Sequence, residues 1–206
     1  MKTFFKIITY IFQPLLISTF GIILLMQLPL FQFFPTSYRI FAVTGTLLFT
    51  GILPALPIVL MMKNRQISDV FISKREERTM PYLFSLLSYI FWVLFLWRTL
   101  QFPVEFVLLA IGSVLSVILM VFINLKWKIS AHTAGMGGLV GGICGVAFLA
   151  GINPVWLIVL ALIISGLVAI SRILLKAHTL SQVVGGFILG FLCVLLPATV
   201  YNFIIK

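Results

Sequence analysis

Acidic side chains are scarce in this chain, which has four Asp and Glu residues against fourteen Lys and Arg. Charged residues of both signs make up only 9% of the sequence, whereas 62% is hydrophobic and the mean hydropathy is +1.25. So few polar side chains cannot cover the surface of a soluble domain of 206 residues. The composition therefore predicts an integral membrane protein.

Cysteine and histidine are equally scarce. Cys144 and Cys193 both fall inside apolar runs, where a free thiol behaves as a small hydrophobic group, so neither indicates a disulfide or a metal site. The two histidines are His132 and His178, and the sequence offers no cluster of carboxylates to join them. We expect no metal ion and no other cofactor.

Long apolar runs dominate the sequence. A spanning helix needs roughly 20 mostly apolar residues, and continuous apolarity favours helices over the alternating strands of a barrel. Prolines stand in the short joints, which leave no room for a second domain. We therefore expect one all-α domain over residues 1–206, a polytopic bundle of six to seven spanning helices. The candidate runs cover residues 7–30, 40–62, 82–101, 103–125, 133–152, 154–171 and 183–205.

The first run is preceded by Lys2 and Lys6, as in a secretory signal, but it is too long and lacks a small-residue cleavage pattern. We expect it to be a helix. With seven spans, the amino-terminal side holds all basic residues except Arg39, Arg98 and Lys206, and the positive-inside rule places that side in the cytoplasm. The net charge of +10 then reflects membrane orientation, and we expect no nucleic-acid partner.

Three polar stretches interrupt the apolar runs: residues 67–82 (ISDVFISKREERTMPY), 128–135 (KISAHTAG) and 171–182 (SRILLKAHTLSQ). Two spans separate the first stretch from the second, and two more separate the second from the third. An even number of crossings returns the chain to the same face of the membrane. The sequence therefore predicts that all three stretches meet on the amino-terminal side.

These stretches carry both histidines together with several Arg and Lys, a composition that suits an anion with many oxygens, such as phosphate. Arginine offers a planar fork of donors, lysine a point charge, and helix amino termini aligned amide groups. Histidine can act as a nucleophile or as a general acid near neutral pH. Gln182 lies four residues after His178, so on a helix it can hold the imidazole ring.

In the third stretch, Ser171 and Arg172 are followed by five residues, His178, three residues and Gln182. The second contains Ser130, Ala131 and His132, and the first contains Lys74, Arg78 and Pro81. In order and spacing these resemble the three motifs of the type 2 phosphatidic acid phosphatase (lipid phosphate phosphatase) family: Lys, Arg and Pro; Ser-Gly-His; and Ser-Arg, five residues, His, three residues, Asp. The resemblance covers roughly residues 69 to 190, and its third motif is the most specific.

The chain departs from the family at several positions. Lys74 lies four residues before Arg78, whereas the family's lysine lies seven residues before the arginine. Ala131 replaces glycine, and Gln182 replaces the aspartate; a neutral amide can orient His178 but cannot stabilise its imidazolium. The family's usual plan has six helices with the first two motifs in one loop, whereas here the runs 82–101 and 103–125 lie between them.

The resemblance implies phosphoryl transfer through a phosphohistidine without a metal. His178 would attack phosphorus and Gln182 would orient it, while His132 would protonate the departing lipid alkoxide and later activate water. The groups implied to bind phosphate are Lys74, Arg78, Ser130, Ala131 with neighbouring amides, and Arg172. The implied substrate is a lipid phosphate or diphosphate, whose tail would lie among the spans. We expect the protein to lie in a bacterial inner membrane, with other membrane lipids around it.

Other interpretations remain open from sequence alone. Lys126, Lys128 and Lys176 are typical of basic anchors at helix ends. Glycines spaced four apart, as at 137 and 141 or 186 and 190, indicate close helix packing rather than a phosphate loop. Gln182 also leaves open a non-catalytic protein of the same fold that binds lipid headgroups or assists transport, while an ordinary transporter would show broken helices at mid-membrane.

Overall fold

The computed structural model describes residues 2–69, 71–72 and 74–205, and all regular structure in these residues is helical. The prediction of an all-α membrane bundle is confirmed: six helices are long and apolar enough to cross a membrane, or seven if a bent pair near the amino terminus is one span. The helices are α1 (Lys2–Ile11), α2 (Pro14–Leu25), α3 (Pro29–Gln32), α4 (Thr36–Thr46), α5 (Leu53–Lys63), α6 (Thr79–Leu94), α7 (Val104–Asn124), α8 (Ala131–Ala150), α9 (Val155–Leu174) and α10 (Leu180–Ile205).

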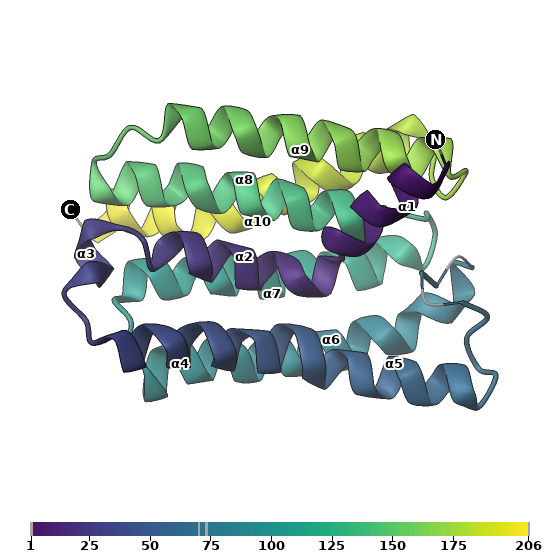
Figure 1. Cartoon of the computed structure of the whole chain (residues 1–206), viewed down its shortest axis with the longest axis horizontal. Helices are drawn as coiled ribbons and strands as arrows, with labels where there is room; N and C mark the ends of the chain where they lie inside the picture. The colour runs from purple at the N-terminus through teal and green to yellow at the C-terminus, as the bar shows by residue number, and fades with distance from the viewer. Residues whose placement is uncertain (1, 70, 73, 206) are drawn as a thin grey trace.

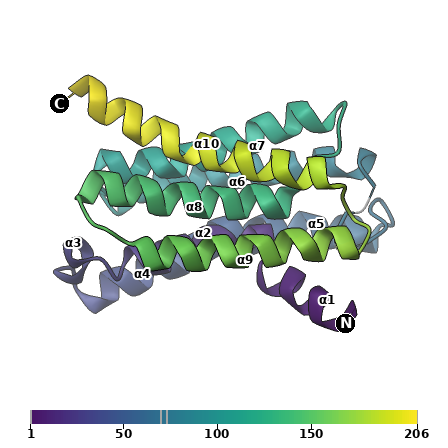
Figure 2. The same ribbon diagram turned by 90° about the horizontal axis from the view of Figure 1, so that it is seen from above.

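Short helices of other types extend two of these spans. A π-helical stretch, η1 (Leu47–Ile52), joins α4 to α5, so that Thr36–Lys63 is one apolar span despite Pro54 and Pro57. A 3-10 turn, η2 (Glu76–Arg78), leads into α6, and a π-helical stretch, η3 (Phe95–Thr99), ends it. The long helices run side by side along one direction (Figures 1 and 2).

The first apolar run is not one straight helix as expected. It breaks between α1 and α2, whose axes differ by 59°. The break comes at Pro14, which has no amide hydrogen to donate, and at Gln13, which is extended with ψ 133° because a residue before proline avoids the helical region. As a result, α1 leaves the bundle beside α9 (Figure 2).

The centre of the bundle is α8, which contacts α2, α7, α9 and α10. Its tightest neighbour is α10: a Cβ added at Gly137 would meet the carbonyl of Phe187, and one added at Gly190 would meet the carbonyl of Ala134. The prediction that spaced glycines pack helices is confirmed at these positions, because no larger residue fits between the two backbones. This contact fixes the start of α8 against the start of α10.

The two apolar runs between the first and second polar stretches form α6 and α7, which pack against each other. Because they are an antiparallel pair, they return the chain to the end of the bundle from which it left. The extra helices relative to the resembled family therefore leave the three polar stretches together at one end, to the right in Figure 1.

Candidate active site

The turn between α9 and α10 brings Arg172 and His178 together. At the end of α9, the amide of Ala177 donates to the Arg172 carbonyl (3.0 Å) and the amide of Lys176 donates to Ile173 (2.9 Å). This is the Schellman pattern, which needs a left-handed residue after the helix; here it is Lys176, with φ 55°. The chain folds back so that the His178 amide also reaches the Arg172 carbonyl (3.3 Å).

The hydrogen bonds around His178 determine which ring nitrogen carries the proton. Its Nδ1 lies 3.0 Å from Oε1 of Gln182, and the same oxygen accepts from the Thr179 amide (3.2 Å), which identifies it as the amide oxygen. An oxygen can only accept, so Nδ1 carries the hydrogen. In the neutral ring Nε2 is therefore unprotonated, and it lies 3.5 Å from Nη2 of Arg78.

Gln182 has a structural role as well. Its side chain accepts from the amide of Thr179, while the Thr179 hydroxyl accepts from the amide of Gln182 (3.5 Å) at the start of α10. These are the two reciprocal bonds of a capping box, in which Gln and Glu are both favoured at this position. The same amide thus starts the helix and orients the imidazole.

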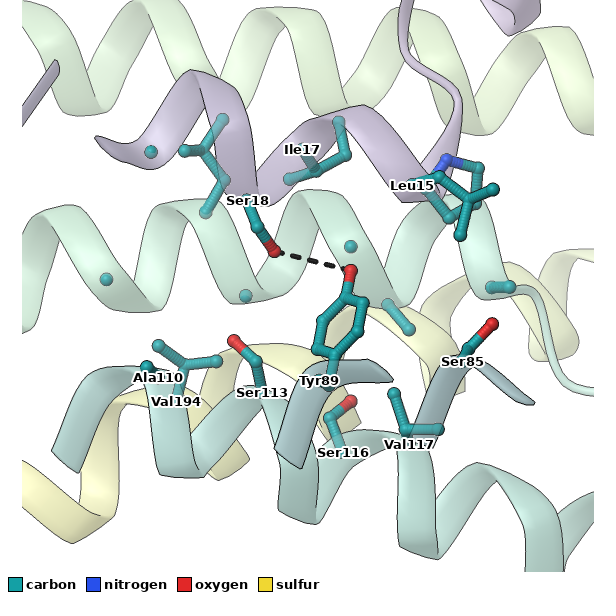
Figure 3. A pocket seen from close by; sticks show the side chains of 18 of the residues that line it. Leu15, Ile17, Ser18, Ser85, Tyr89, Ala110, Ser113, Ser116, Val117 and Val194 are labelled. Atoms are coloured by element: carbon teal, nitrogen blue, oxygen red, sulfur yellow. Dashed lines mark hydrogen bonds between the residues drawn. The ribbon is translucent and has the colours of Figure 1, made fainter. Parts of the chain in front are cut away.

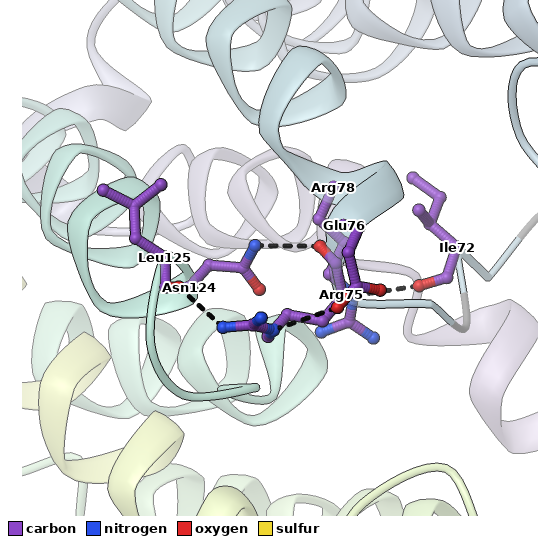
Figure 4. Close-up of polar contacts among 6 residues, drawn as sticks. All are labelled: Ile72, Arg75, Glu76, Arg78, Asn124 and Leu125. Carbon is purple, nitrogen blue, oxygen red and sulfur yellow. Dashed lines mark hydrogen bonds and ion pairs between the residues drawn. The ribbon is translucent and has the colours of Figure 1, made fainter.

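Arg78 connects three segments of the chain. Its Nε donates to the Ile72 carbonyl (2.8 Å), its Nη1 donates to the Ile129 carbonyl (2.9 Å), and its Nη2 faces His178. Its side chain is buried. Next to it, Asn124 at the end of α7 donates to the Arg75 carbonyl (3.0 Å), which anchors η2 against α7 (Figure 4).

Two buried polar groups of the site have no protein partner. Within the described part of the chain, Nε of Arg172 and Nε2 of His132 make no hydrogen bond, although both residues are buried. Phe71 lies over them, with its ring centroid 5.3 Å from the Arg172 guanidinium carbon and 6.3 Å from the His132 ring. A buried polar atom without a partner is costly, so these groups are suited to bind an additional polar ligand.

The site opens into a cavity of about 370 Å³. Five of the residues predicted from sequence line it: Arg78, Ala131, His132, Arg172 and His178. The amino terminus of α8 faces this end of the cavity, since both Ala131 and His132 belong to its first turn. Two imidazoles, two guanidinium groups and a helix amino terminus therefore surround one space, an arrangement that suits a phosphate group.

Two predicted phosphate ligands lie elsewhere. Lys74 points away from the cavity: its side chain is 66% exposed and its Nζ lies 3.1 Å from Glu77. Ser130 is fully buried, and its hydroxyl accepts from the amide of Thr133 (3.4 Å) as the cap of α8. A surface ion pair satisfies the first and a helix cap the second, so the structure assigns neither to the cavity.

Sequence reasoning missed Lys128, which was interpreted as a membrane anchor. The pKa of Lys128 is lowered, first by burial and then by the positive charges of Arg78 and Arg172, so its charge lies within electrostatic range of both. Asp69 is near enough to offset part of this charge on Lys128 and Arg172. Lys126, two residues earlier, is exposed; the sequence alone gives no signal that separates the two lysines.

Phe71 was also missed. It stands seven residues before Arg78, at the spacing of the resembled family's lysine. At this position the chain therefore has an aromatic ring instead of a positive charge.

The positive surroundings keep His178 neutral. Burial, followed by the charges of Arg78 and Arg172, lowers the pKa of His178 to about 3, although the Gln182 hydrogen bond opposes this shift. At neutral pH Nε2 is therefore unprotonated, and its lone pair faces Nη2 of Arg78. As for metals, no three His, Cys, Asp or Glu side chains gather as possible ligands anywhere in residues 2–69, 71–72 and 74–205.

Comparison with known proteins adds no relative: no family model, curated protein or solved structure matches the chain. The structure itself shows a helical membrane protein with a cavity that has both histidines and two arginines at one end.

Proposed function

We propose that the protein is a membrane-embedded phosphatase that removes phosphate from a lipid phosphate or diphosphate through a phosphohistidine and without a metal. The observation that carries the proposal is the cavity itself, which joins both histidines and two buried arginines to an apolar interior among the spans. The chain's resemblance to the lipid phosphate phosphatases in Ser171, Arg172, His178 and His132 supports the same chemistry.

In the first step, Nε2 of His178 attacks phosphorus and the bond from phosphorus to the lipid oxygen breaks. His132, which enters this step as the imidazolium, donates its proton to the departing oxygen, and the phosphoryl group stays on His178. In the second step, His132 takes a proton from water, which attacks phosphorus and releases inorganic phosphate and free His178. Arg78, Arg172 and Lys128 stabilise the negative oxygens in both steps, which is why no metal ion is needed.

The proposal also covers location: a bacterial inner membrane, with the cavity end on the cytoplasmic side. The support is the excess of Lys and Arg in the connections at that end. A reporter domain that is active only in the cytoplasm should be active when it is fused after Lys63.

The main test is phosphate release from a panel of purified lipid phosphates in the presence of a chelator. We expect release with chelator present and inhibition by vanadate, which resembles the phosphoryl group in transfer. His178→Ala should lower the rate on the order of a thousandfold or more, whereas the exposed Lys74→Met should retain the wild-type rate. Strict dependence on Mg²⁺, or full activity of His178→Ala, would contradict the proposal.

The alternative is a non-catalytic protein of the same fold that binds phosphate headgroups. Gln182 favours it, because an amide cannot stabilise the imidazolium as a carboxylate does. This alternative predicts saturable binding of lipid phosphates that depends on Arg172, with no phosphate release and no acid-labile label on His178 after incubation with a radioactive substrate.

A further inference from the structure

The cavity that begins at the phosphate-binding end continues deep into the bundle. On α8, its lining runs from His132 through Leu139 to Val146, a distance of about 21 Å at 1.5 Å per residue. One leaflet accounts for about 15 Å of the roughly 30 Å hydrocarbon thickness. The cavity is therefore deeper than a single leaflet.

The walls of this deep part are mainly apolar and come from α2, α6, α7 and α8. The polar exceptions are hydroxyl groups and the indole N–H of Trp92, which donates to the Thr46 hydroxyl (2.9 Å). Two of the hydroxyl groups are also paired inside the protein: Ser85 donates to the Pro81 carbonyl (2.8 Å), and Ser18 donates to the hydroxyl of Tyr89 (3.3 Å). Such a surface suits a hydrocarbon chain and offers little to a polar ligand.

The Ser18–Tyr89 hydrogen bond crosses the cavity. Ser18 belongs to α2 and Tyr89 to α6, and the phenol ring extends from one wall to the other (Figure 3). Tyr89 is eleven residues beyond Arg78 on one continuous helical span, so the bridge lies about 16 Å from the cationic end. This depth is close to the thickness of one leaflet.

The bridge crosses one continuous cavity, and the two compartments named here are the parts of it on either side of the bridge. The near compartment, which contains Ser85 and Val117, lies between the bridge and the cationic end. The far compartment, which contains Ala110 and Ser113, lies beyond it (Figure 3). On the near side α5 also contributes to the wall, through Ala55, Ile58, Val59 and Met62.

We propose that the cavity holds one hydrocarbon tail of the phosphorylated lipid inside the bundle, and that the Ser18–Tyr89 bridge discriminates substrates by tail length. Every tail enters the near compartment, whereas only a tail longer than one leaflet reaches past the bridge. A lipid tail is the occupant because the phosphate-binding end and the apolar walls belong to one continuous cavity. This inference rests on the proposed function and adds the determinant of its lipid specificity.

Substitutions that fill one compartment at a time test it. The substrates are p-nitrophenyl phosphate, octyl phosphate and a polyprenyl monophosphate with a tail longer than one leaflet. Ala110→Phe should lower kcat/KM for the polyprenyl substrate about tenfold, as expected for lost apolar contacts, and leave the other two unchanged. Ser85→Phe, which fills the near compartment, should lower kcat/KM for both lipids and spare p-nitrophenyl phosphate.

The p-nitrophenyl phosphate rate shows that each variant is folded with an intact site. If Ala110→Phe does not fold, Ser113→Leu fills the same compartment with a smaller change. Ser18→Ala removes the bridge without adding volume and should raise kcat/KM for the polyprenyl substrate relative to octyl phosphate. Equal effects of Ala110→Phe on all substrates, or no effect on any, would overturn the proposal.

A binding measurement separates this inference from the proposed function. His178→Ala protein is mixed with a polyprenyl monophosphate that carries a photoreactive group at the end of its tail, and the labelled peptides are identified by mass spectrometry. We expect label at Leu109, Ala110 or Ser113, whether or not the wild-type protein hydrolyses phosphate. Label confined to outward residues such as Leu87 and Phe91 would overturn the inference, while absence of hydrolysis by the wild type would overturn only the function.

Discussion

The bond between His178 and Gln182 allows the charge beside the proposed nucleophile to be changed at nearly constant geometry. Gln182→Glu keeps the length of the side chain, and glutamate also serves in the capping box with Thr179. Aspartate, which the resembled family has at this position, is one carbon shorter and would not reach both partners equally. The glutamate variant therefore isolates the effect of charge.

The size of the effect follows from the 3.0 Å contact of Nδ1 with the side-chain oxygen. At an effective dielectric constant of about 20, opposite charges about 4 Å apart attract by about 4 kcal/mol, which sets an upper limit of about 3 pKa units. Gln182 is only half-buried, so solvent screening reduces the effect to about 2 units. The pKa of His178, about 3 in the wild type, should rise to about 5 in the variant.

The sign of the rate change is determined by the role of Nε2. A nucleophile must be unprotonated, so a higher pKa of His178 moves the acid limb of kcat/KM upward. Below about pH 5, the ratio of variant to wild-type rate should fall about tenfold per pH unit, while at pH 7 the more basic ring should react at least as fast. Taking the ratio at each pH cancels the ionisation of the substrate phosphate.

The assay is phosphate release between pH 4 and 8 from one soluble phosphate ester in one detergent, with Gln182→Met as the matched control. Methionine keeps the bulk but accepts no strong hydrogen bond, so this variant should lose about tenfold in rate without a shift of the profile. If the glutamate and wild-type profiles coincide, or if the methionine variant shifts as the glutamate variant does, His178 is not the group whose protonation limits the reaction.

Three further predictions concern single residues. Lys128→Met should lower kcat/KM for phosphate release at least tenfold, through loss of a charge-assisted contact, whereas the exposed Lys126→Met should not; equal effects would remove Lys128 from the site. Lys176→Gly should stabilise the protein by about 0.5–1 kcal/mol in denaturant unfolding, because glycine adopts the left-handed conformation freely; a lower stability would argue against the Schellman turn. Gly190→Ala should destabilise by about 1–3 kcal/mol by overpacking against α8, while Gly166→Ala, whose Cβ meets nothing within 4 Å, should be neutral or slightly stabilising.

The polar stretches could be grouped from the sequence because membrane crossing is a one-dimensional problem. Each apolar run must cross, so the number of runs between Arg78, His132 and His178 determines whether they return to the same end. The i to i+4 spacing of His178 and Gln182 is likewise local and needs only a helix start to become a contact. These features depend on order along the chain, which the sequence contains in full.

The first apolar run shows that continuous hydropathy does not make a helix straight. Pro14 and the extended Gln13 break it into α1 and α2, although its hydropathy is continuous. Hydropathy indicates that a segment prefers lipid; the backbone at proline decides whether the segment is straight.

The sequence determined that the protein is an all-α membrane bundle, approximately where its spans lie, and at which end of the bundle its histidines meet. The tertiary structure decided which cations face the cavity, that Ser130 caps a helix, and that α2, α6, α7 and α8 enclose a space deeper than one leaflet. The reason is rotation about the helix axis and the path of loops. Lys74, Lys126 and Lys128 have the same polarity in sequence, and only the packing of distant segments around Arg78 leaves Lys74 and Lys126 exposed and Lys128 partly buried.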